Sequence, residues 1–188
     1  MLRMAWTYEQ LAVALDASDL WRDVDDETRK AARTQVAHGE YLFNLDLLDS
    51  YVVSADGEDL AEGGVEEFLS ELSPLVAREG VDLQVQRLLD PYADIPADRY
   101  VVEINEEPCL IWTKEDAVYE DLWGQATLRP LARVNELLAA AGSRRRMFTL
   151  YGGGNEGLAY LLDPDVIAIV RASGLIDQRD TPTLATAD

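Results

Sequence analysis

The spacing of apolar residues changes at Gly80, and this change constrains the fold of the 188-residue chain more than any other feature. Before Gly80, apolar residues such as Phe68 and Leu72 recur every three or four positions, which is the period of an amphipathic helix. After it, apolar residues such as Leu83 and Val85 alternate with polar ones, as in a strand with one buried face. The chain therefore begins with helices and continues with strands.

Three helices are predicted in the first part of the chain. Thr7 and Gln10 fit a capping box, in which the threonine hydroxyl accepts a backbone hydrogen bond and the glutamine side chain reaches back to the cap. This box predicts a helix over 8–17. Apolar residues at steps of three, four or seven predict further helices from 26 to about 44 or 48, and over 60–80. Pro74 is expected to end or kink the last of these helices, although Ser73 as a cap and Pro74 in the first turn could start it again.

Two β-hairpins are predicted after residue 80. The runs 99–104 and 108–112 are rich in β-branched and apolar residues and are separated by a three-residue polar turn. Pro108 favours an edge position for the second strand, because proline cannot donate a hydrogen bond to a neighbour. A second hairpin is expected from 146–151 and 158–162, which flank a glycine-rich segment.

Helices are expected after each hairpin, at 127–141 and 163–173, and can cover one face of an antiparallel or mixed sheet. Asp163 is expected to cap the second of these helices and Gly174 to end it. The sequence thus predicts an α+β fold, with a helical N-terminal part followed by a mostly antiparallel sheet. The sheet would contain the two hairpins and one further strand. We expect one domain over 1–176, with a helical part (1–80), an α+β part (81–176) and a flexible tail (177–188).

The net charge of −20, from 36 acidic and 16 basic residues, restricts the partners of the chain. The excess is concentrated in the first 80 residues, which hold 18 acids and six bases. Such a field repels nucleic-acid phosphates and attracts cationic partners, so we expect no nucleic acid and a basic protein partner. The alternative is that the acidity serves only solubility or adaptation to salt.

Cysteine, histidine and hydropathy point to a protein without a cofactor or a membrane span. Cys109 stands alone and cannot form an intrachain disulfide, and its apolar neighbours favour a buried, inert thiol. His38, the single histidine, has no second ligand for zinc and sits in a predicted helix. No apolar run reaches the length of a membrane span, so a cytoplasmic location without membrane contact is expected.

A glycine-rich segment, Gly152–Gly157, follows the three arginines Arg144–Arg146. A phosphate-binding loop requires a following helix and, in the P-loop, a lysine next to serine or threonine, and neither is present here. We therefore interpret the segment as a hairpin turn that needs positive φ angles. Two alternatives remain open, namely nucleotide binding over 144–157 and anion binding by the arginines, which we otherwise expect to pair with the chain's own carboxylates.

Carboxylates and aromatic residues gather around the first hairpin and the helix after it. They could form an acidic, aromatic-rimmed surface for a basic protein, an acid pair or a divalent-cation site, or only a solvated face. We assign no catalytic or metal-binding residue. The candidate binding residues are Glu103, Glu106, Glu107, Trp112, Glu115, Asp116, Tyr119, Glu120, Trp123, Gly153, Gly154 and Asn155.

One part of the chain, residues 99–173, resembles a group of known proteins. The pattern includes the strand Tyr100–Asn105, then Trp123, the helix Val134–Leu138 and the stretch Phe148–Asn155. It looks like small uncharacterised bacterial α+β proteins, some of which are similar to immunity proteins of polymorphic-toxin systems. The matching residues belong to turns, caps and core. The resemblance implies a protein that binds and neutralises another protein.

Two main hypotheses follow. The first is a non-enzymatic binding protein, of the immunity or inhibitor type, that engages a basic protein through steered association. The second is a small carboxylate-dependent hydrolase or metal-dependent enzyme. The sequence leaves the oligomeric state open.

Overall fold

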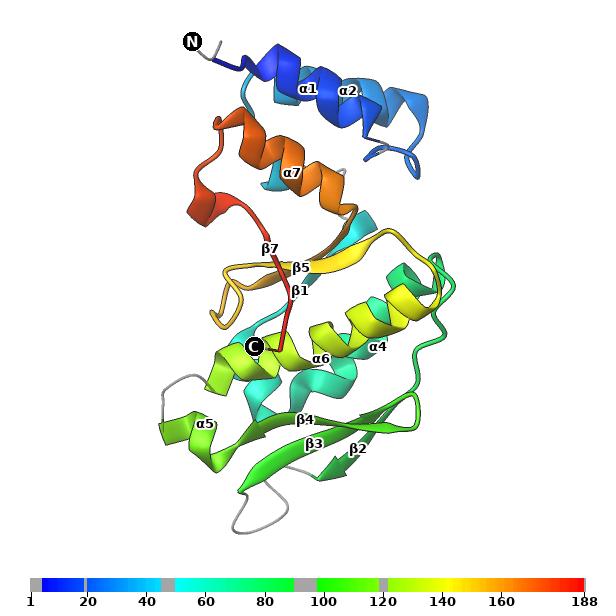
Figure 1. Cartoon of the computed structure of the whole chain (residues 1–188), viewed down its shortest axis with the longest axis vertical. Helices are drawn as coiled ribbons and strands as arrows, with labels where there is room; N and C mark the ends of the chain where they lie inside the picture. The colour runs from blue at the N-terminus through cyan, green and yellow to red at the C-terminus, as the bar shows by residue number, and fades with distance from the viewer. Residues whose placement is uncertain (1–4, 19, 45–49, 90–97, 119–121, 188) are drawn as a thin grey trace. The chain divides into compact units, whose positions relative to one another are not determined.

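The structure is a computed structural model, in which we describe residues 5–18, 20–44, 50–89, 98–118 and 122–187 (Figure 1). It confirms the α+β class. The chain divides into two compact units, whereas the sequence predicts one domain whose helical part ends at residue 80. Unit 1 comprises Met1–Tyr51 and Leu162–Pro182, and unit 2 comprises Val52–Leu161 and Thr183–Asp188.

Unit 1 is helical, and local signals in the sequence set its helix ends. Helix α1 (Tyr8–Ala17) begins with the expected capping box between Thr7 and Gln10. Helix α2 (Asp26–Ala37) is shorter than predicted, because the chain turns at Gly39, where φ is +89°. A 3-10 turn, η1, follows at Leu42–Asn44.

The C-terminal part of unit 1 contains helix α7 (Pro164–Ser173), the 3-10 turn η4 (Gln178–Asp180) and their connection. Asp163 caps α7 and Gly174 ends it with φ +65°, as the sequence predicts. Helix α1 packs against both α2 and α7. A hydrogen bond from the Tyr41 hydroxyl to the Asp180 carbonyl, 2.5 Å long, further joins the two stretches of chain that build this unit.

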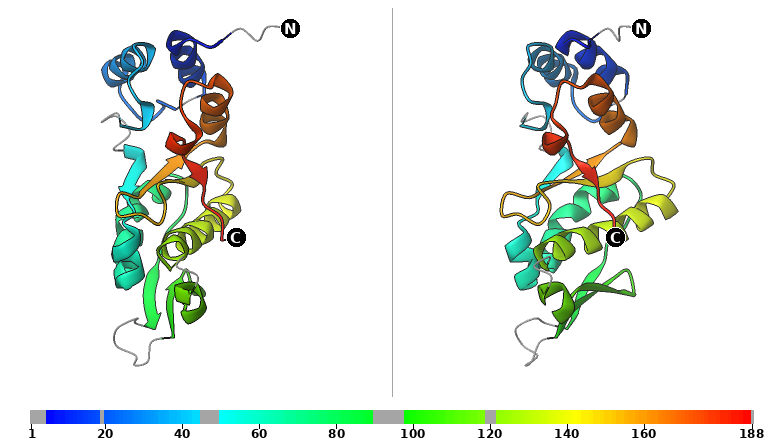
Figure 2. Two further views of the ribbon diagram at one scale, coloured as in Figure 1. Left: turned by 90° about the vertical axis from the view of Figure 1, so that its left-hand side faces the viewer. Right: turned by 60° about the vertical axis from the view of Figure 1, so that its left-hand side comes forward.

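Unit 2 contains two sheets with helices α4 (Val65–Ala77) and α6 (Leu122–Ala140) between them (Figure 2). Helix α4 contacts strands β1 and β2, and α6 contacts β4 and β5, so each helix touches both sheets. Apolar residues from these elements form one continuous core. The sequence predicts the strands but not their division between two sheets.

The first sheet has the strand order β1-β6-β5-β7. The two predicted strands β5 (Arg146–Leu150) and β6 (Leu158–Leu162) are hydrogen-bonded neighbours at its centre. Strand β1 (Val52–Ser54) runs antiparallel to β6, and β7 (Thr183–Leu184) runs antiparallel to β5. The segment 177–188, predicted to be a flexible tail, therefore supplies a 3-10 turn and an edge strand. Pairing with β5 and burial of Ala185 explain the difference.

The second sheet has the order β2-β3-β4 and is antiparallel throughout. Its strands are β2 (Val85–Leu89), β3 (Arg99–Ile104) and β4 (Glu107–Thr113), the last two being the predicted first hairpin. Alternate residues of β3, beginning with Tyr100, point into the core. As Pro108 indicates, β4 lies at an edge.

Side chains from the helices bind the backbone of both edge strands of this sheet. Glu66 on α4 accepts a hydrogen bond of 2.9 Å from the backbone N–H of Arg87 in β2. Arg129 on α6 donates one of 3.2 Å to the carbonyl of Ile111 in β4. These contacts fix the sheet to the helical layer by polar as well as apolar interactions.

The helix predicted over 60–80 is interrupted at Gly63 and not at Pro74. Helix α3 (Gly57–Asp59) leads into a π-helical turn, η3 (Leu60–Gly64), in which Gly63 has φ +112°. The carbonyl of Gly63 accepts hydrogen bonds from Arg87 Nη2 (2.8 Å) and the Tyr100 hydroxyl (3.2 Å), so sheet residues satisfy a group that a regular helix would satisfy itself. Pro74 remains within α4, and its exposed position leaves the unpaired carbonyl four residues earlier open to water.

The C-terminal helix of unit 2 also differs from the prediction. Helix α6 begins at Leu122 and passes through both Gly124 and Pro130, whereas the sequence predicts a start at Thr127. A short helix, α5 (Lys114–Val118), precedes it. Within the described ranges, none of the helices is both long and apolar enough to span a bilayer.

Candidate functional site

Unit 2 carries an acidic segment along α3, η3 and α4. Between Asp56 and Glu71 the sequence contains seven acidic residues and no basic one. We define the acidic segment by its exposed glutamates, which are Glu58, Glu62, Glu67 and Glu71. In the described part of the chain, none of these four glutamates forms an ion pair. Glu66, which lies between them in the sequence, differs because its Oε2 lies 2.5 Å from Arg87 Nε.

The glycine-rich loop between β5 and β6 packs against the start of the acidic segment. A Cβ atom added to Gly57 would lie 2.8 Å from the backbone carbon of Gly153, and one added to Gly153 would lie 2.9 Å from the Cα of Gly124. The Gly57 N–H donates to the carbonyl of Gly154 at 3.0 Å. Three backbones from α3, the loop and α6 therefore meet where only glycine fits.

This close packing brings aromatic residues to the N-terminal end of the acidic segment. Asn155 donates a hydrogen bond of 3.2 Å from Nδ2 to Glu58, and so ties the loop to α3. Trp123 next to Gly124 is 39% exposed, and Tyr151 in the loop is 49% exposed. The predicted residues Trp123, Gly153, Gly154 and Asn155 thus come together, although the two glycines contact the protein's own backbone. Large aromatic side chains beside exposed charge are typical of protein-binding surfaces.

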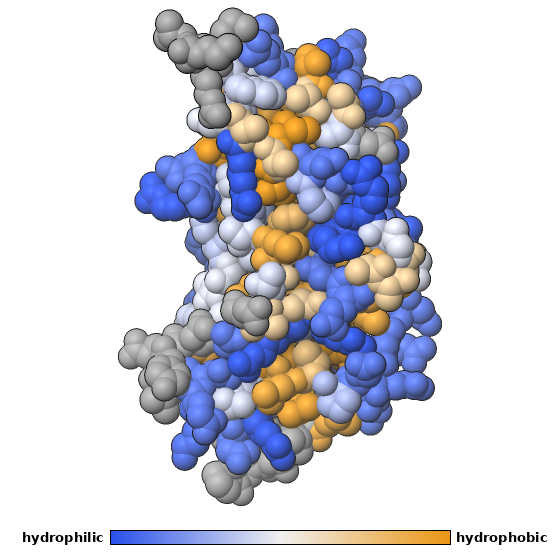
Figure 3. All heavy atoms as spheres, in the orientation of Figure 1, coloured by the Kyte–Doolittle hydropathy of each residue, from blue (hydrophilic) through white to orange (hydrophobic). Residues whose placement is uncertain are grey.

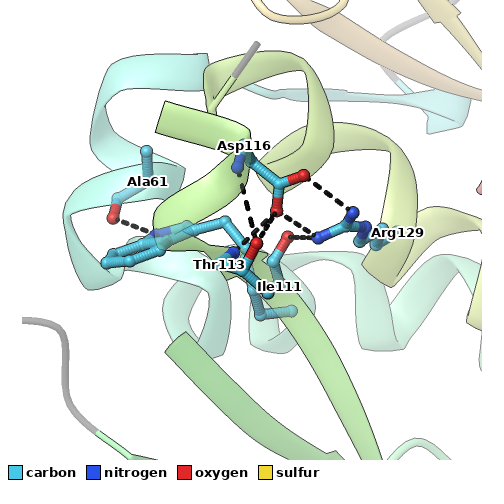
Figure 4. Close-up of polar contacts among 6 residues, drawn as sticks. Ala61, Ile111, Thr113, Asp116 and Arg129 are labelled. Atoms are coloured by element: carbon cyan, nitrogen blue, oxygen red, sulfur yellow. Dashed lines mark hydrogen bonds and ion pairs between the residues drawn. The ribbon is translucent and has the colours of Figure 1, made fainter. Parts of the chain in front are cut away.

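Asp116, another predicted binding residue, serves the protein's own structure (Figure 4). Its carboxylate accepts hydrogen bonds from the Thr113 backbone N–H (2.6 Å) and from Arg129 Nη1 (2.7 Å) and Nη2 (3.1 Å). Burial raises the pKa of Asp116, but the hydrogen bonds from Arg129 and Thr113 outweigh it and hold the pKa below the ordinary 3.8. Asp116 therefore caps α5 and joins it to α6, and its neighbour Glu115 is exposed.

Trp112 is not available at the surface, contrary to the prediction. It is 8% exposed, its indole Nε1 donates to the carbonyl of Ala61 at 2.9 Å, and its ring meets that of Tyr100 edge-to-face at 6.4 Å. It was predicted as an interface aromatic because it lies close to acidic residues in the sequence. Its place in the hairpin instead directs it to the core, where the Ala61 carbonyl of the π turn accepts its N–H.

The three glutamates of the first hairpin lie away from Glu115 and Asp116. Glu106 is exposed in the turn between β3 and β4, with φ +64°, and Glu107 begins β4. Because β4 is seven residues long, its two ends lie roughly 20 Å apart.

The hairpin glutamates also differ in their contacts. Glu107 pairs with Arg133 of α6 at 3.0 Å, and Glu103 is half-buried in β3. In the described ranges, no three His, Cys, Asp or Glu side chains are grouped so that they could hold a metal ion. Tyr119 and Glu120, the remaining predicted residues, lie outside the described residues.

Two of the three arginines at the start of β5 contact the protein itself. Arg145 is buried, and its Nη1 lies 3.6 Å from Glu79 Oε1 at the end of α4. Arg146 donates to the carbonyl of Ser143 at 2.7 Å. The glycine-rich loop leads into strand β6, so its amides do not form the N-terminus of a helix that could bind a phosphate.

Cys109 lies in β4 at the margin of the core. Burial raises the pKa of its thiol to about 11, so the reactive thiolate is scarce near neutral pH. This agrees with the expected inert thiol. His38 follows the last residue of α2 and is exposed.

The sequence reasoning missed the four glutamates of the acidic segment and Tyr151. The signal for the glutamates is present in the sequence, because residues 34–77 contain ten acids and no lysine or arginine, and seven of these acids lie between Asp56 and Glu71. Nothing in the sequence indicates that the loop containing Tyr151 reaches α3, since that contact depends on the packing of three glycines.

No protein-family model matches this chain, and neither does any of the curated proteins or solved structures with which it was compared.

Proposed function

We propose that this protein is a non-enzymatic binding protein that uses the acidic segment of unit 2 to engage a basic protein, as an immunity or inhibitor protein does. The observation that carries the proposal is that Glu58, Glu62, Glu67 and Glu71 are exposed without an ion pair from the described chain, and that the exposed Trp123 lies at the N-terminal end of this segment. The carboxylates attract a cationic partner over distance, and the aromatic side chains supply apolar contact once it has docked.

The proposal predicts a salt-dependent complex. Proteins retained by the immobilised chain from an extract of its source cells would be identified, purified singly and titrated against it. Because exposed charges are screened by ions, the dissociation constant should rise steeply between about 50 and 500 mM NaCl. A complex whose affinity is indifferent to salt would contradict the proposal.

Matched variants locate the interface on the acidic segment. Replacing Glu62, Glu67 and Glu71 together by glutamine should weaken binding by roughly ten-fold or more, because each exposed pair contributes up to about 1 kcal/mol. The control replaces three exposed acids of unit 1, Asp26→Asn, Glu27→Gln and Glu40→Gln, and changes the net charge equally. Equal loss in both triple variants would show that only net charge matters.

A third variant tests the aromatic contribution. Trp123→Ala should weaken the same complex by more than ten-fold if Trp123 is a central contact, since truncation of such anchors costs about 2 kcal/mol or more. Its salt dependence should remain, because the charges are still present.

A further inference from the structure

Unit 1 has an open groove of about 680 Å³ along the outer side of helix α1. This helix is apolar on two sides. One side is buried against α2 and α7 through Leu11, Ala12 and Leu15. The other side forms the groove, which is lined by Trp6, Glu9, Gln10, Val13, Ala14 and Ala17. In Figure 3, orange and cream side chains lie among the blue ones over α1 at the top of the view.

The groove residues have the spacing of a helix–helix seam. Within α1, Gln10, Val13 and Ala17 follow one another at intervals of three and four residues, as on the contact face of packed helices. Trp6 precedes the N-cap Thr7 and adds an indole to the groove. Val13 is 53% exposed, the largest fraction among the large apolar residues of the described chain. The unit's own helices leave this seam uncovered in the described residues, because α2 and α7 both pack on the other side of α1.

The shape and charge of the groove select its occupant. Along α1, from Glu9 to Ala17, it extends roughly 12 Å, a little over two helical turns, and the small side chains of Ala14 and Ala17 allow a second backbone to approach closely. Among the described residues that line the groove, only Glu9 is charged. Glu9 forms no ion pair with another described residue. A second copy of this chain would bring a further net charge of −20 against the first, which opposes self-association.

We propose that the groove on α1 receives an amphipathic helix of a basic partner protein, whose apolar seam packs on Trp6 and Val13 and whose lysine or arginine pairs with Glu9. Helix-in-groove recognition with apolar anchors at heptad spacing is a common way for a helical surface to bind a protein segment. This inference does not rest on the proposed function, because the groove lies in unit 1 and the acidic segment in unit 2. Either can fail without the other.

A designed peptide tests the proposal with the full chain. The probe is a helical peptide of about three heptads with leucine at the seam positions and lysine elsewhere, and the comparison peptide has glutamate in place of lysine. The lysine peptide should bind, and Val13→Glu should weaken binding at least ten-fold. Leu110→Glu, which adds the same charge at another exposed apolar position, should weaken it less than two-fold. Glu9→Gln should weaken it by a smaller factor than Val13→Glu.

Tryptophan emission supplies a second measurement. The emission of Trp6, obtained as the difference between the wild type and Trp6→Phe, should shift to shorter wavelength when the peptide covers the indole. Far-UV circular dichroism would check that Val13→Glu remains folded, as expected for an exposed position.

Four outcomes would overturn the proposal. The first is that Val13→Glu and Leu110→Glu weaken binding of the lysine peptide equally, and the second is that the Trp6 emission does not shift when this peptide is added. The third is that the glutamate peptide binds as tightly as the lysine peptide. The fourth is that the lysine peptide does not bind at about 200 μM, a concentration that corresponds to a binding free energy of roughly −5 kcal/mol. A dimer in sedimentation velocity that Val13→Glu dissociates would also overturn it, because it would assign the groove to a second copy of the chain.

Discussion

Asn135 and Met147 hydrogen-bond each other in both directions, with 2.6 Å from Met147 N to Asn135 Oδ1 and 3.1 Å from Asn135 Nδ2 to Met147 O. The same Nδ2 donates to the Ala185 carbonyl at 3.0 Å. One side chain of α6 therefore binds both β5 and Ala185, the residue that follows strand β7. The link explains why a segment with little apolar content is ordered at the edge of the sheet.

Asn135→Ala should destabilise unit 2 by about 3 kcal/mol, because three hydrogen bonds worth about 1 kcal/mol each are lost. Urea unfolding would measure the loss, and amide hydrogen exchange should become faster at Ala185. Glu136→Ala, at the exposed neighbouring position, is the control and should change stability by less than about 0.5 kcal/mol. Similar losses in the two variants would contradict the assigned role of Asn135.

Gly153→Ala should be much more destabilising than Gly142→Ala. Both glycines have positive φ, +84° and +77°, so alanine is strained by about 1 kcal/mol at either position. A methyl group at Gly142 would meet nothing within 4 Å, whereas one at Gly153 would lie 2.9 Å from the Cα of Gly124. We expect about 1 kcal/mol for Gly142→Ala and about 3 kcal/mol for Gly153→Ala in urea unfolding. Equal values would show that the loop does not pack tightly on α6.

Asp116→Asn should destabilise the protein at neutral pH and much less in acid. The lowered pKa of Asp116 means that its ionised form stabilises the fold above the pKa of the unfolded chain, near 3.8. That stabilisation is lost as the pH falls through the still lower pKa of the folded state. The variant should lose about 2 kcal/mol at pH 7, and the difference from wild type should shrink below pH 4. A difference independent of pH would assign the loss to packing rather than to charge.

The Cys109 thiol should react slowly with a disulfide reagent in the native protein. A pKa raised from 9.0 to about 11 leaves roughly 100-fold less thiolate at pH 8 than an ordinary cysteine has. The rate should rise to that of a free thiol when urea unfolds the chain. A native rate equal to the unfolded rate would show that β4 is open to solvent at this position.

Local signals in the sequence predicted the elements whose ends are fixed by neighbouring residues. The capping box of Thr7, the cap at Asp163 and the left-handed Gly174 set α1 and α7 where expected. The first hairpin was also predictable, because two apolar runs flank a short polar turn.

Features that depend on distant residues were not predictable. Pro74 was expected to break the third helix, but the break occurs at Gly63, where Tyr100 and Arg87 of the second sheet satisfy the exposed carbonyl. Strand β7 has only two residues, pairs with β5 and is followed by Ala185, whose carbonyl accepts a hydrogen bond from Asn135, so it depends on residues distant in the sequence. The candidate site was partly predictable, since Trp123 and Asn155 are in it, whereas Trp112 became core because its indole meets the Ala61 carbonyl.

The contacts that Glu66 and Arg129 make with the edge strands of the second sheet also limit how this protein can recognise another. A partner strand added at β2 would have to displace Glu66 from the Arg87 amide. One added at β4 would meet Pro108, which has no N–H, and the Ile111 carbonyl already bound by Arg129. Strand addition at either edge of the second sheet, and aggregation through these two edges, are therefore disfavoured.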